Sequence, residues 1–414
     1  MPNYLDYQKA MGLNWIHVSG FEDDTSKTSA YFKGSGVTIG VIDDGIESGH
    51  SDLTSNFLGR YSGLNISGCS CPCEGVDNFG LHGTHVAGIV AGAGAVEIYG
   101  VCPLSKVYDM PIISSEYSSS ETLLVFKNSI EFAIENNIKV LNCSFVLTKD
   151  EIDDPVNAVV VSGLKVAIKD AYEDNIIICV AAGNNSSDVD YFGANGSSDI
   201  GTILNVKEYV LVAGSIYDIA VFQSSPFFNR TLNFSENVRR ADFSSYGKRM
   251  IKNGMAAPGE QIYSSVPVNS YAVYDGTSMA SPFIAGVAAM IIGFFQKAEI
   301  SYTSQMVFKI IKACVFNVKY DSGPANVPTN IVYSASWGEK KIYIKGWNRH
   351  TGYGFINFEL VSRVLMQMNR NGGQLPLTKQ NLPEGKRTFD TLPAGWPDIG
   401  PPAFTKPATD PDFT

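Results

Sequence analysis

The sequence contains no uninterrupted run of 18 apolar residues, the length that a membrane-spanning helix needs, so no membrane span is expected. Its longest apolar stretch, residues 284–295, is interrupted by Gly286 and Gly293 and predicts a buried core helix. Positive charge is also scarce, since 31 lysines and arginines stand against 41 acidic residues for a formal net charge of −10. A sequence-independent nucleic-acid binder needs a dominant basic surface, so nucleic acid is not expected as a partner.

The first residues, Met1 to Asp6, lack the basic and apolar regions of a secretory signal peptide. The localisation is therefore unknown, and the alternatives are a secreted mature domain and an intracellular protein. Seven cysteines are an odd number, so a complete disulfide framework within one chain is excluded. Cys143 and Cys179 lie in apolar runs and are expected to be small buried side chains. Residues 69–73 (Cys-Ser-Cys-Pro-Cys) predict a structural loop, with a disulfide or a metal as alternatives.

Runs rich in valine and isoleucine alternate with helix-like stretches. Continuously apolar runs, typical of buried parallel strands, occupy residues 37–42, 138–141, 176–180 and 209–212. Residues 121–135 and 156–173 have the apolar spacing of amphipathic helices. The pattern predicts an α/β fold, a doubly wound and mostly parallel sheet with helices on both faces. Residues 1–370 are expected to form one domain, followed by a proline-rich tail over residues 371–414, which hold eight of the 19 prolines.

Three glycine-flanked segments place reactive side chains at predicted strand ends or helix starts. Residues 41–45 (Val-Ile-Asp-Asp-Gly) end an apolar strand in a carboxylate and a turn. Residues 82–88 (His-Gly-Thr-His-Val-Ala-Gly) and residues 276–282 (Gly-Thr-Ser-Met-Ala-Ser-Pro) each open a helix of small residues. Together they supply a carboxylate, an imidazole and a hydroxyl at the positions where α/β folds carry reactive groups.

These segments resemble the signature blocks of the subtilisin-like serine proteases, in that family's chain order of Asp, His and Ser. Residues 181–184 (Ala-Ala-Gly-Asn) match the block of the family's oxyanion-hole asparagine. Residues 257–259 (Ala-Pro-Gly) and 352–357 (Gly-Tyr-Gly-Phe-Ile-Asn) add two supporting matches, so the resemblance covers about residues 30 to 365. It implies a subtilisin-like fold, and it implies that residues 1–370 form a catalytic domain.

The resemblance implies a catalytic role for each signature side chain. A serine hydroxyl is a weak nucleophile at neutral pH, so Ser278 would need His82 as its general base. Asp43 would hold the other imidazole nitrogen and stabilise the imidazolium. Asn184 and the Ser278 backbone N–H would bind the oxyanion. His85 is expected to be structural. The residues implied in substrate binding are Ser144, Phe145, Val146, Ala182, Gly183 and Thr277.

The chain also departs from the family pattern. Residues 142–147 (Asn-Cys-Ser-Phe-Val-Leu) lack the glycine that usually follows this core strand, so Val146 is expected to narrow the pocket for the substrate side chain before the cleaved bond (P1). Residues 149–161 are predicted to be an acidic insertion. Together with the Asp43-Asp44-Gly45 sequence, this insertion resembles the kexin and furin branch of the family. In that branch acidic pockets would select substrates with arginine or lysine. An acidic solvated loop is the favoured alternative.

The family implies no cofactor for the reaction, but it implies a structural calcium ion in many members. Asp52 matches one expected ligand, whereas the loop of residues 92–99 is short and lacks the expected asparagine, so calcium binding is left open.

The sequence therefore predicts a serine endopeptidase that acts on protein or peptide substrates, with a pro-region or inhibitor as a further partner. A narrow processing protease and a catalytically silent peptide-binding relative are the alternatives.

Overall fold

A computed structural model describes residues 33–64, 80–112, 117–186, 197–218, 238–247, 252–316, 335–337, 340–342 and 352–356, together with residues 361, 364, 365 and 368. A ten-stranded sheet runs through this structure in the order β13-β16-β10-β8-β6-β4-β1-β3-β2, with β9 paired to β8. The eight strands from β16 to β2 are parallel to their neighbours, while β13 and β9 pair antiparallel. The α/β fold with a mostly parallel sheet is confirmed.

The strands of the large sheet are short and mostly buried. They are β1 (Thr38–Asp43), β2 (Phe57–Arg60), β3 (Lys106–Pro111), β4 (Val140–Cys143), β6 (Ile177–Ala181), β8 (Val210–Asp218), β9 (Val238–Arg240), β10 (Gly254–Pro258), β13 (Val315–Phe316) and β16 (Phe355–Ile356). Three small antiparallel pairs complete the strands: β5 (Leu147–Thr148) with β7 (Ser197–Ser198), β11 (Ile262–Val266) with β12 (Ser270–Tyr274), and β14 (Ala335–Trp337) with β15 (Lys340–Ile342).

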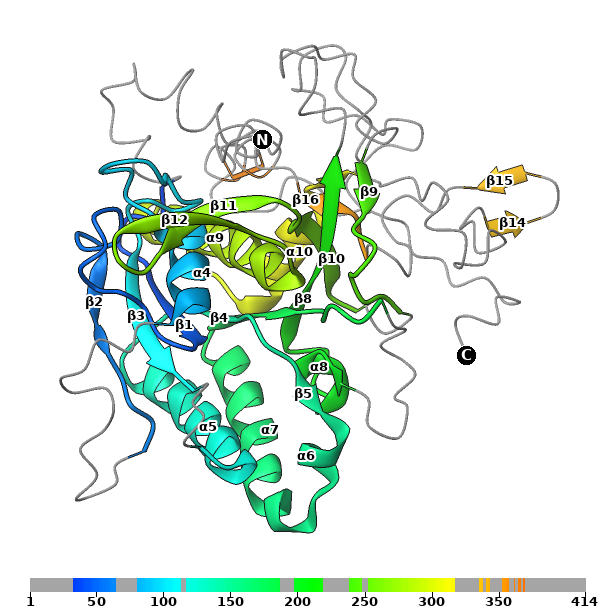
Figure 1. Ribbon diagram of the computed structural model, residues 1–414. Helices are drawn as coiled ribbons and strands as arrows, with labels where there is room; N and C mark the ends of the chain where they lie inside the picture. Colours follow the sequence, from blue (N-terminus) through cyan, green and yellow to red (C-terminus); the bar gives the residue numbers. More distant parts are fainter. Residues whose placement is uncertain are drawn as a thin grey trace.

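Helices cover both faces of the sheet (Figure 1). One layer contains α5 (Ser119–Glu135) and α7 (Ala158–Glu173), and the other contains α4 (Leu81–Ala91), α9 (Thr277–Lys297) and α10 (Ser304–Ala313). The short elements are α6 (Lys149–Asp153), η1 (Pro155–Asn157) and α8 (Ile200–Ile203). Two separate apolar cores result, one between the sheet and each helical layer, because every central strand presents buried side chains on both faces.

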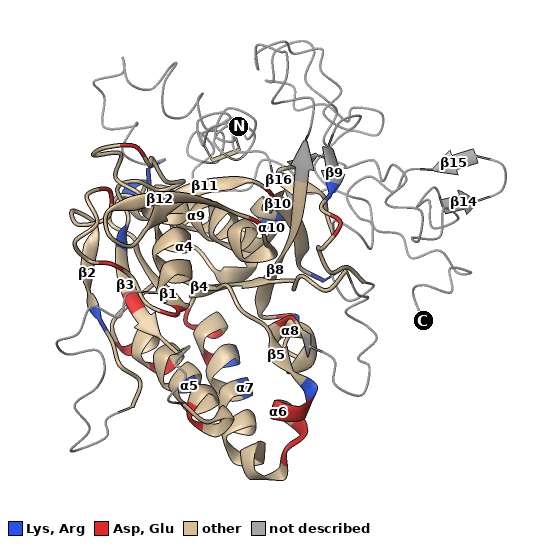
Figure 2. Cartoon of the chain, viewed as in Figure 1, with Lys and Arg blue, Asp and Glu red and all other residues tan. Residues whose placement is uncertain are grey.

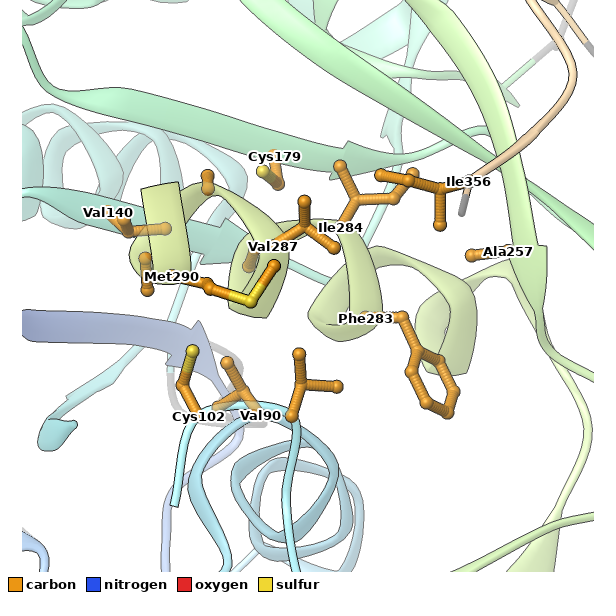
Figure 3. Packing of buried hydrophobic residues seen from close by; sticks show 14 of the residues in the cluster. Val90, Cys102, Val140, Cys179, Ala257, Phe283, Ile284, Val287, Met290 and Ile356 are labelled. Carbon is orange, nitrogen blue, oxygen red and sulfur yellow. The ribbon is translucent and has the colours of Figure 1, made fainter. Parts of the chain in front are cut away.

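Helix α9 lies at the centre of the larger core. Figure 3 shows Phe283, Ile284, Val287 and Met290 of this helix among side chains from the sheet and from α4. The helix is long and apolar enough to cross a membrane, but 94% of its apolar window is buried inside the protein. The expectation of a buried core helix at residues 284–295 is therefore confirmed.

The predicted strands and helices were found within a few residues of their expected positions. The run at residues 37–42 became β1, and those at 138–141, 176–180 and 209–212 became β4, β6 and β8. The helices expected at residues 121–135 and 156–173 are α5 and α7. The boundary after residue 370, the tail over residues 371–414 and the cysteines of residues 69–73 lie outside the described residues.

Candidate active site

The candidate residues meet where neighbouring parallel strands end. Strand β1 ends at Asp43, β4 is followed directly by Ser144, and β6 is followed by the segment that leads to Asn184. These three strands are adjacent in the sheet, in the order β6-β4-β1. Because parallel strands share one carboxyl edge, the topology brings residues from distant parts of the chain to a single place.

Asp43 and His82 form a direct hydrogen-bonded pair. The Nδ1 atom of His82 lies 2.7 Å from Oδ1 of Asp43, whose side chain is fully buried, whereas the His82 side chain is 32% exposed. Burial alone would lower the pKa of His82, but the charge and hydrogen bond of Asp43 and the charge of Asp44 outweigh it and raise that pKa. In the described part of the chain, Nε2 of His82 has no hydrogen-bond partner and is free to take a proton.

Asp44 caps the helix that carries His82. Helix α4 has no acidic residue in its first turn, and Gly80 at its start has no side chain to cap it. The carboxylate of Asp44 accepts the backbone N–H groups of His82 at 3.2 Å and Gly83 at 2.6 Å. Sequence reasoning missed this role, although a helix start without its own cap was a signal for it.

His85 is a structural residue, as expected. It is fully buried, and its Nε2 atom lies 3.0 Å from the Ile262 carbonyl and 3.2 Å from the Ala272 carbonyl, so Nε2 carries the proton. Burial lowers the pKa of His85 to about 3, which keeps its ring neutral at ordinary pH. His85 therefore ties α4 to the β11–β12 hairpin, which leads directly to Ser278.

Ser278 lies in the first turn of α9, close to Ser144. Its hydroxyl donates to the backbone carbonyl of Ser144 at 2.9 Å, and not to the His82 ring. The Ser144 hydroxyl in turn donates to the Ser278 carbonyl at 2.8 Å. The two serines are therefore joined by a pair of reciprocal hydrogen bonds.

The side-chain amide of Asn184 lies beside the start of α9. Its Oδ1 accepts hydrogen bonds from the backbone N–H and the hydroxyl of Thr277, both at 2.8 Å, which fixes the orientation of the amide. A Cβ atom at Gly276 would lie 3.2 Å from Nδ2 of Asn184 and 3.5 Å from the backbone nitrogen of Ser278. The Asn184 amide nitrogen and the Ser278 backbone nitrogen therefore both lie close to Gly276, which carries no side chain.

The residues expected to bind substrate differ in how they can do so. Thr277, Ala182 and Ser144 are buried. Thr277 therefore positions its hydrogen-bond partners Gly183 and Asn184. Ser144 can meet a substrate only through its backbone. Phe145 is half-buried and packs edge-to-face on Phe126, with ring centroids 5.2 Å apart.

Val146 and Gly183 come together from the two segments that flank the predicted substrate site. The Cγ1 atom of Val146 lies 3.3 Å from the position that a Cβ at Gly183 would occupy. Gly183 has a backbone φ of 99°, which favours glycine, and its N–H donates to the Thr277 hydroxyl at 3.0 Å. The valine side chain therefore occupies space between the two segments.

Three acidic residues of the insertion are engaged in local contacts. Glu151 caps α6 through Thr148, Asp153 pairs with Lys149, and Asp154 accepts the backbone N–H of Val156 at 2.9 Å. Figure 2 shows the acidic stretch of α6 at the edge of the molecule. Asp44 is likewise bound to helix N–H groups, so the kexin- and furin-like features gain no support.

The groups around Asp52 do not fit a calcium ion. Its carboxylate accepts the backbone N–H groups of Val96, Glu97 and Ile98 at 2.6–3.2 Å and the Tyr271 hydroxyl at 2.8 Å. Calcium needs six to eight oxygen ligands, whereas the groups that face Asp52 are donors. Burial alone would raise the pKa of Asp52, but these donors outweigh it and lower that pKa. Nor do the described residues contain three or more acidic, histidine or cysteine side chains placed to hold a metal.

Sequence comparison relates the chain to known proteases. The signature of the Subtilase family matches residues 34–354. The chain is 32% identical over 262 residues to subtilisin DY of Bacillus licheniformis, across 63% of this chain and 78% of that protein. It is 30% identical over 266 residues to subtilisin E of Bacillus subtilis, across 63% of this chain, and spans only 56% of that protein's length.

Solved structures share the fold at lower identity. The patellamide maturation protease PatA has a TM-score of 0.54 and 19% identity, across 80% of this chain and 98% of that chain. A lanthipeptide protease has a TM-score of 0.57 and 16% identity, across 88% and 95%. With the family signature covering most of the described residues, the chain belongs to the Subtilase family and is a subtilisin-like serine endopeptidase.

Proposed function

We propose that Asp43, His82 and Ser278 form the catalytic triad of this endopeptidase and that Asn184 completes its oxyanion hole. The observation that carries the proposal is the 2.7 Å contact between Asp43 and Nδ1 of His82, whose side chain is 32% exposed and whose Nε2 has no hydrogen-bond partner among the described residues. No metal or other cofactor is needed for this chemistry, because the imidazole moves the proton and backbone and amide N–H groups hold the charge.

The proposed assignment implies the following reaction. Ser278 turns its hydroxyl from the Ser144 carbonyl to His82, transfers the proton to Nε2 and attacks the substrate carbonyl carbon. Asp43 stabilises the imidazolium that forms. The carbonyl oxygen gains negative charge in the space beside Gly276, where Asn184 Nδ2 and the Ser278 N–H can donate to it. His82 then returns the proton to the leaving amine, and water repeats the sequence to release the acyl group.

Replacing Asn184 with leucine removes the side-chain donor at nearly constant size. We expect kcat to fall by about 10²- to 10³-fold, with a small change in KM, because the oxyanion exists only in the transition state. Steady-state hydrolysis of a peptide reporter measures both constants. A loss confined to KM would place Asn184 in ground-state binding instead.

We infer further that the enzyme is a narrow processing protease with a preference for small side chains at P1. The proposal is supported by Val146, whose Cγ1 lies 3.3 Å from the position of a Cβ at Gly183, so that its side chain would limit the room for a large P1 side chain between the two segments. Maturation proteases of this fold exist, among them PatA, so the architecture is compatible with such a role.

Replacing Val146 with glycine should widen the P1 specificity. We expect kcat/KM for phenylalanine and leucine P1 reporters to rise by roughly 10- to 100-fold relative to an alanine P1 reporter. Val268→Gly is the matched control, because Val268 is 88% exposed and already has a positive φ of 63° that glycine accommodates.

Three results would change this assignment. Parent enzyme that prefers phenylalanine over alanine at P1 contradicts the small pocket, and faster cleavage after arginine or lysine would favour the kexin-like alternative. Folded protein with no turnover on any reporter would favour the peptide-binding alternative, or a cleft covered by a pro-region or inhibitor.

A further inference from the structure

The proline in helix α9 removes a hydrogen bond from the nucleophile's own peptide unit. In an α-helix the carbonyl of residue i accepts the N–H of residue i+4, and Pro282 stands four residues after Ser278. Proline has no N–H, and its ring pushes the carbonyl four residues earlier away from the helix axis. The Ser278 carbonyl therefore lacks its usual helical donor, and a buried carbonyl without a partner is costly.

Ser144 supplies the missing donor from another element. It follows β4, lies 134 residues before Ser278 in the sequence, and donates its hydroxyl to the Ser278 carbonyl at 2.8 Å. Its side chain is almost completely buried, so the donor end of this partly buried bond is shielded from water.

Two further buried side chains fix the direction of the Ser144 hydroxyl. Asn142 donates its Nδ2–H to the Ser144 oxygen at 2.9 Å, so the serine proton is left for the Ser278 carbonyl. The amide of Asn142 is itself held by the Ser281 hydroxyl, which donates to Oδ1 at 2.7 Å. The chain of hydrogen bonds Ser281–Asn142–Ser144–Ser278 thus starts and ends on the first turns of α9.

We propose that Ser144 is a positioning residue for the nucleophile, in which its hydroxyl replaces the N–H that Pro282 cannot supply. Rigidly held backbone at Ser278 sets the direction of its side chain and of the N–H that faces the oxyanion space. The proposal rests on the assignment of Ser278 as nucleophile. It gives Ser144 a role separate from substrate binding, since its side chain faces α9.

The variant Ser144→Ala removes the side-chain donor of the partly buried Ser278 carbonyl. We expect the rate constant for labelling of Ser278 by a fluorophosphonate, and kcat for peptide hydrolysis, to fall by about 10- to 100-fold, with KM within about twofold of the parent. Ser129→Ala is the matched control. The Ser129 hydroxyl is also buried, on α5, but has no hydrogen-bond partner among the described residues, so its loss should leave the rates unchanged.

A second variant separates positioning from general disturbance. Pro282→Ala restores an N–H at the position that can reach the Ser278 carbonyl within the helix. In that background Ser144→Ala should slow labelling by no more than about twofold. Ser144→Ala, Pro282→Ala and the double variant form a double-mutant cycle. Measured on the equilibrium constant for unfolding in denaturant, this cycle should show the same coupling between the two substitutions without relying on activity.

The outcomes distinguish this proposal from the proposed function. Equal labelling and unfolding constants for the parent and Ser144→Ala, or fully additive effects of the two substitutions, would overturn it. Absence of labelling in the parent would refute the nucleophile assignment, while the unfolding cycle would still test the hydrogen bond. If Pro282→Ala does not fold, Asn142→Leu replaces it. That variant keeps the Ser144 hydroxyl but removes its orienting donor, so labelling as fast as the parent's would then contradict the proposal.

Discussion

Ser278→Ala should lower kcat for peptide hydrolysis by about 10⁶-fold, to the level of catalysis by the remaining oxyanion donors. The structure places Ser278 in the first turn of α9, where its hydroxyl donates to the Ser144 carbonyl. Without it, His82 retains its contact with Asp43 but has no nucleophile to deprotonate. Steady-state hydrolysis with purified protein measures the loss.

The fold should survive this substitution. Ser278 loses one hydrogen bond to the Ser144 carbonyl, and an ordinary hydrogen bond contributes only about 1 kcal/mol to stability. Denaturant unfolding of the variant should therefore be cooperative, with a midpoint close to the parent's. Turnover within tenfold of the parent, in a preparation shown free of contaminating protease, would require a different nucleophile.

Asp43→Asn should have the second largest effect, a fall in kcat of about 10⁴-fold at neutral pH. The asparagine keeps the size of the side chain but removes the charge that stabilises the imidazolium and the acceptor that fixes the proton on Nδ1. His82 would then be free to take the tautomer that places its proton on Nε2, toward the serine. The kcat for peptide hydrolysis and the rate constant for fluorophosphonate labelling should therefore both decline.

The pH dependence of the variant gives a second readout. Asp43 is the main group that raises the pKa of His82, and Asp44 adds to the effect. Activity requires neutral His82, so it rises with pH through the His82 pKa. Loss of the Asp43 charge lowers that pKa, and the acid limb of residual kcat/KM should shift to lower pH. An acid limb at the same pH as in the parent would mean that a group other than His82 controls the rise of kcat/KM with pH.

The sequence was most informative where one contiguous block carries both a structure and a function. The block at residues 41–45 combines a buried strand with the carboxylate at its end, and both were found as expected. The block at residues 276–282 was likewise expected to open a helix, and α9 begins at Thr277. Strands such as β2 and β11 were not predicted, because they mix apolar, glycine and hydroxyl residues and depend on their neighbours in space.

The relations that sequence could not supply join segments far apart in the chain. The bond between Ser144 and Ser278 spans 134 residues, and nothing in either local pattern specifies the other. The surroundings of Asp52 could not be predicted either. Its match to a calcium ligand did not decide whether calcium binds, and only the fold shows that backbone N–H groups and Tyr271 surround its carboxylate.

Labelling with a fluorophosphonate probe, read by intact mass, tests the assignment of Ser278 as an activated nucleophile most directly. We expect one label on the parent chain, located at Ser278 by peptide mapping, and none on Ser278→Ala. Well-folded parent protein that takes no label, or a label that persists in Ser278→Ala, would contradict it.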